Sequence, residues 1–263
     1  MSLKGKSLCV LVPMHDGKCT HNYHLSVTKL ILACQKNNVA MTELVSPGGA
    51  ILSMVRNELT NHFMHRTRAT HALLVDSDIG FEPDDVLRML DSDHEVIGAP
   101  CTRKNIRWDR VVKAVKKANG KELTVAEMKI AAGDPVAVYE NPADVDVYEP
   151  QPMNFLGTGL LMVKRDAFEL LESAYPERWY YSRSSILSID TDGAPAVRRV
   201  HEFFTLKIDK RTRIFLQEDY AFCKECRSCG IIPVMFPWVR TTHYGGHLFV
   251  GDLAGMAALT GEL

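Results

Sequence analysis

Asp76 and Asp78 are the residues of this 263-residue sequence whose spacing points most directly to chemistry. They follow the apolar run 71–75 (HALLV), which has the length of a buried strand, and Pro83 then opens a helical pattern. On an extended backbone, residues two apart project to the same side. Two such carboxylates suit a hard divalent cation that also contacts phosphate groups. The alternative is a turn at the end of the strand, since Asp is common in turns.

The segments around this pair predict an α/β fold, because apolar runs of strand length alternate with helical patterns. The expected strands are 6–13, 39–45, 71–75, 94–100, 155–163 and 231–237. The expected helices are 24–35, 51–63, 83–90, 166–171 and 216–222. A strand, a helix and a strand in succession imply a right-handed parallel crossover. In such sheets ligands bind at the carboxyl ends of the strands, where Asp76 and Asp78 lie.

The length suits one large α/β domain covering residues 1–263. The 31 basic and 32 acidic residues give a net charge of −1, so no global field favours nucleic acid or an anionic membrane, although a small basic patch remains compatible. No apolar run approaches the roughly 20 residues of a membrane span, and the short polar start does not resemble a signal peptide. We therefore expect a soluble, cytoplasmic protein.

The cysteines and the irregular segments carry weaker signals. Seven cysteines at irregular spacing predict reduced thiols rather than a disulfide framework. Cys223, Cys226 and Cys229 are expected to pack as small buried side chains on a helix; a metal cluster is the alternative, but its fourth ligand is missing. Residues 105–150 predict an insertion that could act as a lid, and the tail from residue 248 predicts a second lid-like element. A loop at 184–194 contains Asp190 and Asp192, which we interpret as a turn.

The segment LLVDSDIGF at 73–81 resembles the D-x-D segment of nucleotide-sugar glycosyltransferases with the GT-A fold. The resemblance implies a Rossmann-like three-layer sandwich with a mixed, mostly parallel central sheet. It also implies an Mn²⁺ or Mg²⁺ ion that bridges the donor diphosphate. Asp78 corresponds to the acid that binds the metal, and Asp76 to the acid that approaches the ribose or the metal.

Further segments resemble the same family in the same order along the chain, and they imply donor-binding residues. These are Pro13, Met14, His15, Arg56, Asn57, Asp76, Gly157 and Gly159. The first three follow the first strand and correspond to the loop that contacts the nucleobase. The Arg-Asn pair corresponds to residues that hold phosphates or the acids, and the glycines to the floor of the sugar pocket. The alternatives are a solvated loop histidine, a solvated helix arginine and packing glycines.

Glu218 and Asp219 lie in QEDYAFC, which resembles the Glu-Asp motif that supplies the catalytic base of inverting GT-A enzymes. Inverting transfer needs a carboxylate that accepts the proton of the attacking hydroxyl, and Asp219 is our first choice for it. In a retaining enzyme the pair would bind sugar hydroxyls instead. The structural alternative is that acids are favoured in the first turn of any helix.

His243 follows the last predicted strand and resembles the C-terminal metal ligand of GT-A enzymes, a role for which we prefer it to His247. Imidazole is compatible with Mn²⁺, and a surface histidine is the alternative.

The sequence thus predicts a metal-dependent, inverting glycosyltransferase that uses a nucleoside-diphosphate sugar and a glycan or other hydroxyl acceptor. Four alternatives stay open: a retaining enzyme, transfer to modified DNA bases, a nucleotidyltransferase, and an inactive sugar-nucleotide-binding protein. Residues 12–17 lack the glycine- and basic-rich loop expected of a nucleotidyltransferase, and the neutral net charge does not favour DNA.

Overall fold

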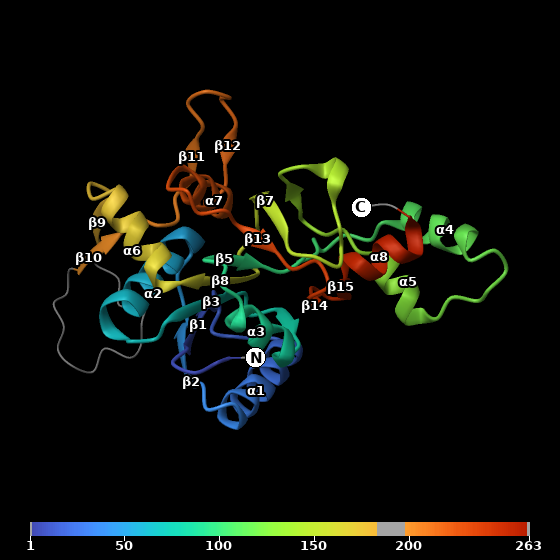
Figure 1. Ribbon diagram of the computed structural model, residues 1–263, viewed down its shortest axis with the longest axis horizontal. Helices are drawn as coiled ribbons and strands as arrows, with labels where there is room; N and C mark the ends of the chain where they lie inside the picture. Colours follow the sequence, from blue (N-terminus) through green and yellow to red (C-terminus); the bar gives the residue numbers. More distant parts are fainter. Residues whose placement is uncertain (1, 183–197, 262–263) are drawn as a thin grey trace.

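The computed structural model describes residues 2–182 and 198–261 and is built around an eight-stranded sheet (Figure 1). In spatial order its strands are β2 (Ala40–Ser46), β1 (Ser7–Pro13), β3 (His71–Val75), β8 (Leu160–Lys164), β5 (Val96–Gly98), β13 (Val234–Met235), β7 (Gln151–Phe155) and β6 (Val138–Tyr139). The predicted turn at Asp190 and Asp192 lies outside the described residues.

The sheet is mixed, and most of its strands run in one direction. Strands β2, β1 and β3 are parallel to one another, and β5 is parallel to β13. Strand β8 is antiparallel to both β3 and β5, and β7 is antiparallel to both β13 and β6. Only β8 and β7 therefore oppose the other strands of this described sheet. This confirms the predicted α/β class with a mixed, mostly parallel sheet.

Helices cover both faces of the sheet, namely α1 (His21–Lys36) and α3 (Pro83–Asp91) on one face and α2 (Leu52–Arg66), α6 (Arg165–Ala174) and α7 (Glu218–Ser228) on the other. The remaining described helices, α4 (Trp108–Lys117), α5 (Val125–Ala131) and α8 (Leu253–Thr260), pack against one another. Alternate residues of each strand enter different cores: on β1, Cys9 and Leu11 pack with α2, α6 and α7, whereas Val10 and Val12 pack with α1 and α3. The period of two along the strands thus produces three layers.

Three smaller sheets complete the described structure. They are β15 (Leu248–Gly251) with β14 (Thr241–Tyr244) and β4 (Ile79–Phe81); β10 (Arg198–His201) with β9 (Trp179–Ser182); and β11 (Lys207–Ile208) with β12 (Phe215–Leu216). The first of these matters most for the site, because it joins the C-terminal part of the chain to the segment just after Asp78. No helix in the described ranges is long and apolar enough to cross a membrane.

Several predicted elements differ from the structure. The single strand expected at 155–163 is wrong: β7 ends at Phe155, β8 begins at Leu160, and the glycines lie in the connection. The strand expected at 231–237 is reduced to two residues, since the chain next to Pro233 and Pro237 cannot pair fully. The segment 105–150 contains α4, α5, β6 and a short 3₁₀ helix, and the Thr124 capping box opens α5 as predicted.

The tail and the cysteines pack inside the fold. The tail from residue 248 forms β15 and α8, and α8 lies against α4 and α5. Cys223 and Cys226 are fully buried in the core beneath α7, which confirms the packing prediction for these two thiols. Cys229 is partly buried against the same core.

Candidate active site

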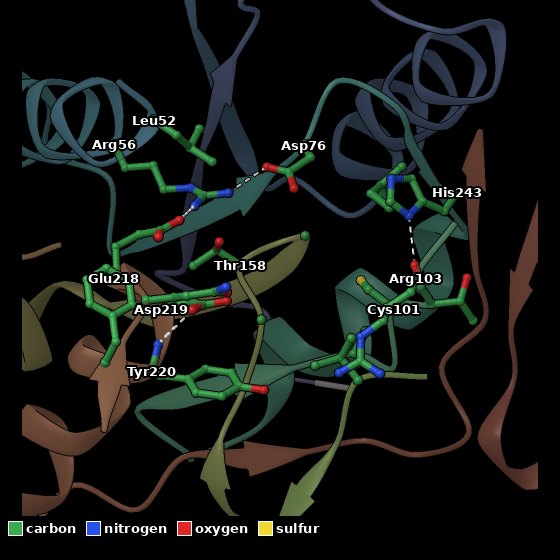
Figure 2. Close-up of a pocket in the computed structure, with 18 residues that line it drawn as sticks. Leu52, Arg56, Asp76, Cys101, Arg103, Thr158, Glu218, Asp219, Tyr220 and His243 are labelled. Carbon is green, nitrogen blue, oxygen red and sulfur yellow. Dashed lines mark hydrogen bonds and ion pairs between the residues drawn. The ribbon is translucent and has the colours of Figure 1, made fainter. Parts of the chain in front are cut away.

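A cavity of about 570 Å³ lies at the carboxyl end of β3 and brings together residues from seven parts of the chain (Figure 2). Of the predicted site residues, it is lined by Arg56, Asp76, Gly157, Gly159, Glu218, Asp219 and His243. The α/β topology explains this placement, because the carboxyl ends of neighbouring parallel strands meet at one edge of the sheet. Gly159 also ties the site to the sheet, since its carbonyl accepts a hydrogen bond of 3.2 Å from the backbone N–H of Asp76.

Asp76 and Asp78 lie in a turn rather than on extended backbone, so the expectation that both face one side is wrong. Strand β3 ends at Val75, and the N–H of Ile79 donates to the Asp76 carbonyl at 3.0 Å. The turn directs the two carboxylates to different partners: Asp76 contacts Arg56 of α2, and Asp78 contacts Lys104 and His243.

Arg56 joins two of the predicted acids. Its Nη2 lies 2.8 Å from Asp76 Oδ1, and its Nη1 donates to Glu218 Oε1 (Figure 2). The Arg56 residue is 3% exposed, because α2 is buried on almost every side over this stretch. The planar fork of the guanidinium can donate to two carboxylates at once, which a lysine cannot do with the same geometry. The solvated alternative for Arg56 is therefore excluded.

Asp219 carries the most perturbed carboxyl of the cavity. Burial, followed by the negative charge of Glu218, raises the pKa of Asp219 to about 6, although its Oδ1 accepts a 2.8 Å hydrogen bond from the N–H of Tyr220. Gly157 lies beside this carboxylate: a Cβ at that glycine would be 3.8 Å from Asp219 Oδ2. The position at the start of α7 alone would favour the charged form, so burial outweighs it.

His243 lies next to Asp78 although 165 positions separate them in the sequence. Strand β14 pairs antiparallel with β4, so that His243 lies opposite Ile79, and the N–H of Tyr244 donates to the Asp78 carbonyl at 3.0 Å. His243 Nε2 lies 3.3 Å from Asp78 Oδ1. The opposite oxygen, Asp78 Oδ2, lies 2.6 Å from Lys104 Nζ.

Hydrogen bonds fix the orientation of the His243 ring. Its Nδ1 lies 2.7 Å from the carbonyl oxygen of Thr102, and a carbonyl can only accept, so Nδ1 carries the hydrogen. Burial lowers the pKa of His243, but the bonds to Asp78 and Thr102 outweigh it and leave the pKa raised. Burial acts on Asp78 in the opposite sense, and the bonds from His243 and Lys104 leave the pKa of Asp78 lowered.

The separation of Asp78 and His243 is compatible with two ligands of one divalent ion. Adjacent ligands of an octahedral ion at about 2.1 Å lie about 3.0 Å apart, close to the 3.3 Å between His243 Nε2 and Asp78 Oδ1. The Nδ1–H bond to a backbone carbonyl is the outer contact that metal-binding histidines usually make. Within residues 2–182 and 198–261 no group of three or more His, Cys, Asp or Glu could hold a metal. Asp76 therefore does not form the predicted three-ligand site with Asp78 and His243.

Four predicted donor-binding residues lie outside the lining of this cavity. Asn57 is 2% exposed, and its amide binds the backbone of Phe204 through both its oxygen and its nitrogen. Pro13 ends β1, Met14 packs against the core beneath α1, and His15 Nδ1 lies 3.1 Å from the carbonyl of Gly49. A nucleobase role for the segment 13–15 stays a prediction from the resemblance alone.

Sequence reasoning missed several cavity residues. Tyr220, Thr158 and Cys101 line the cavity. The ring of Tyr220 stacks on that of Phe155, with the ring centroids 4.6 Å apart. Tyr220 directly follows Asp219, so the QEDY motif was a usable signal for it. Arg103 also lines the cavity; the resemblance implied that Arg103 and Lys104 could meet phosphate or an acidic acceptor, although a surface charge was the preferred interpretation for each.

No protein-family model matches this sequence, and no curated protein matches it. Solved structures that resemble the fold include the following three. A197 from STIV is 11% identical, covers 91% of this chain and 86% of its own, and has a TM-score of 0.45. The catalytic domain of Drosophila β1,4-galactosyltransferase 7, in complex with xylobiose, is 12% identical, with coverages of 94% and 71% and a TM-score of 0.44. GalNAc-T7 with UDP, GalNAc and Mn²⁺ is 10% identical, with coverages of 90% and 43% and a TM-score of 0.45. At these identities the likeness concerns the course of the backbone alone.

Proposed function

We propose that this protein is a glycosyltransferase that moves a sugar from a nucleoside-diphosphate sugar to a hydroxyl acceptor. The observation that carries the proposal is the presence of two kinds of group at one cavity: His243 paired with Asp78, and Asp219, a carboxylate of raised pKa. The first suits a cation that meets a diphosphate, and the second suits the proton of an acceptor. A volume of about 570 Å³ is in the range of small-molecule sites.

Asp219 is the proposed catalytic base of an inverting transfer. A pKa of about 6 leaves it ionised at neutral pH and still able to accept a proton. Arg56 holds Glu218 in an ion pair, which supports Asp219 as the member of the pair that meets the acceptor. The acceptor oxygen forms a bond to the anomeric carbon as the bond from that carbon to the diphosphate breaks. The hydroxyl proton passes to Asp219, and the bonding electrons leave with the diphosphate.

Asp78 and His243 would hold Mn²⁺ or Mg²⁺, with the donor diphosphate as a further ligand. When bound, such an ion offsets the charge that develops on the leaving diphosphate. Asp76, fixed by Arg56, would approach the ribose of the donor, as the resemblance of its segment implies. Lys104 now contacts the other oxygen of Asp78, and its ammonium would add positive charge beside the phosphates.

Hydrolysis of a panel of nucleotide sugars with Mn²⁺ tests the proposal. We expect release of a nucleoside diphosphate by the wild type, loss of release in Asp78→Ala and Asp219→Asn, and unchanged folding by circular dichroism. Asp84→Asn, an exposed acid in the first turn of α3, is the matched control and should keep full activity. Wild-type release by Asp78→Ala would overturn the central assignment. Metal-dependent binding of a nucleotide sugar without any turnover would identify a binding protein instead.

A further inference from the structure

Helix α4 carries an apolar face that is exposed in the described structure. Trp108 is 67% exposed, and Val112 and Val115 are each 52% exposed. The three positions are i, i+4 and i+7 of one helix, so they form a single stripe along it. On most surface helices such a stripe faces the core; here it faces outward and includes Trp108, the one aromatic residue of α4.

A different face of α4 packs against the protein. Ala114 is 1% exposed, Arg110 Nη1 donates to the carbonyl of Gly133 at 2.9 Å, and Lys117 Nζ donates to the carbonyl of Ala258 at 2.9 Å. Figure 1 shows α4 at the periphery of the molecule beside α5 and α8, far from the central sheet. The stripe is therefore not used to attach α4 to the rest of the described chain.

The same segment concentrates positive charge. Residues 107–121 contain six basic residues and one acidic residue, a net charge of +5, whereas the whole chain has a net charge of −1. Lys116 and Lys121 are among its exposed residues. At 100° per residue, Lys116 lies about 40° beyond Val112 around the helix, so that its ammonium borders the stripe. Arg107 is paired with Asp109 and Asp134, so the excess positive charge of this segment lies mainly on its lysines.

We infer that α4 binds the surface of an anionic lipid bilayer, with Trp108, Val112 and Val115 in the interfacial region and the lysines at the lipid phosphates. A helix with an apolar face that includes Trp and a Lys-rich border is typical of segments that lie in a membrane interface. A nucleic acid would meet the charge but not the apolar stripe, and a neutral apolar partner would not meet the charge. The inference does not depend on the proposed sugar transfer.

The position of α4 would bring the cavity close to that surface. Arg103 lines the cavity, and α4 begins five residues later at Trp108. Five residues of extended chain span at most about 18 Å. A membrane bound by α4 would therefore lie near the segment that lines the cavity.

Flotation with lipid vesicles tests the inference. We expect the wild type to float with vesicles of phosphatidylcholine and phosphatidylserine, not with phosphatidylcholine alone, and to be released by high salt. Trp108→Ala/Val112→Ala/Val115→Ala should abolish flotation; these exposed changes keep or raise helix propensity. Lys116→Glu/Lys121→Glu should lower the partition coefficient at least about tenfold.

Matched variants of similar size and charge lie elsewhere on the surface. Leu25→Ala/Ile31→Ala/Leu32→Ala on α1 removes three exposed apolar side chains, and Lys4→Glu/Lys36→Glu reverses two exposed lysines; both should float like the wild type. Failure of the wild type to bind anionic vesicles, or binding that survives the α4 triple substitution, would overturn the inference. So would a dimer in light scattering that the triple substitution abolishes, or capture of duplex DNA without vesicle binding.

Discussion

Arg56 is the residue that allows two carboxylates to lie side by side in a largely buried site. It contacts Asp76 and Glu218, and it also opposes the rise in the pKa of Asp219. A buried cation between two acids contributes to stability mainly because it compensates their negative charges, which would be costly to bury alone. The geometry of the site thus depends on a side chain that is not itself proposed to react.

Replacing Arg56 by Met should therefore destabilise the protein. The change keeps the length of the side chain but leaves Glu218 without its cation, and we expect the free energy of unfolding to fall by about 3 kcal/mol, as measured with urea. Arg56→Met/Glu218→Gln removes the uncompensated charge and should recover part of this loss. Equal stability of Arg56→Met and the wild type would show that the ion pairs do not compensate buried charge.

The pKa of Asp219 predicts the pH dependence of activity. Because the base must be ionised, kcat/KM for transfer should rise with pH, pass half of its plateau near pH 6 and stay constant above it. The rate should be measured over pH 5 to about 8 with the donor far below saturation. If kcat/KM of Asp219→Asn still rises with pH near pH 6, the titration belongs to another group.

The same shift makes stability depend on pH. The folded pKa of about 6 lies above the value of about 3.9 for an unfolded chain, so the folded state binds the proton more tightly. The stabilisation of the folded state by the protonated Asp219 carboxyl is fully present below about pH 4. It is lost as the pH rises through about 6. Asp219→Asn stays neutral, so at pH 8 it should be about 3 kcal/mol more stable than the wild type. Urea unfolding at pH 4 and pH 8 measures the difference, and equal stability at pH 8 contradicts the shift.

At the scale of elements, the pairing of β4 with β14 brings His243 to Asp78. The pairing requires close approach at Gly80, where a Cβ would overlap Thr242 Oγ1 and lie 2.9 Å from the Cβ of Asn22. Glycine within a strand often marks such an approach. The site therefore depends on a residue that carries no functional group.

Gly80→Ala should separate β4 from β14. It should therefore weaken the binding of the divalent ion that we propose His243 and Asp78 share. We expect a lower melting temperature and a loss of metal-dependent activity, both partly restored by Thr242→Ala in the same chain. Gly48→Ala is the control, because a Cβ at Gly48 meets nothing within 4 Å, and it should behave like the wild type. A fully active and stable Gly80→Ala would refute the proposed role of the close approach.

At the scale of the molecule, the sequence predicts what local patterns determine. The apolar run at 71–75 and Pro83 correctly place β3 and α3, because strand length and helix starts are local properties. The burial of Arg56 was not predictable, since its helix is covered on nearly all sides and a single apolar stripe reports only one face.

Long-range placement was the harder part of the site. The order of motifs suggested His243, but its distance from Asp78 depends on strand pairing between β4 and β14, which no local pattern encodes. The break at 156–159 was missed because Gly157 and Gly159 sit within an apolar run that continues on both sides. The predicted extended conformation at Asp76 and Asp78 failed for a local reason: the turn propensity of Asp outweighed the strand before it.

Binding of nucleoside diphosphates with and without Mn²⁺ tests most directly whether Asp78 and His243 share one ion. In calorimetric titrations with a panel of the common nucleoside diphosphates, at least one should bind the wild type only when Mn²⁺ is present. Asp78→Asn and His243→Ala should lose this binding, and His247→Ala, at an exposed histidine four positions further on, should retain it. Binding of equal affinity without the metal, or unchanged binding by His243→Ala, would contradict the account.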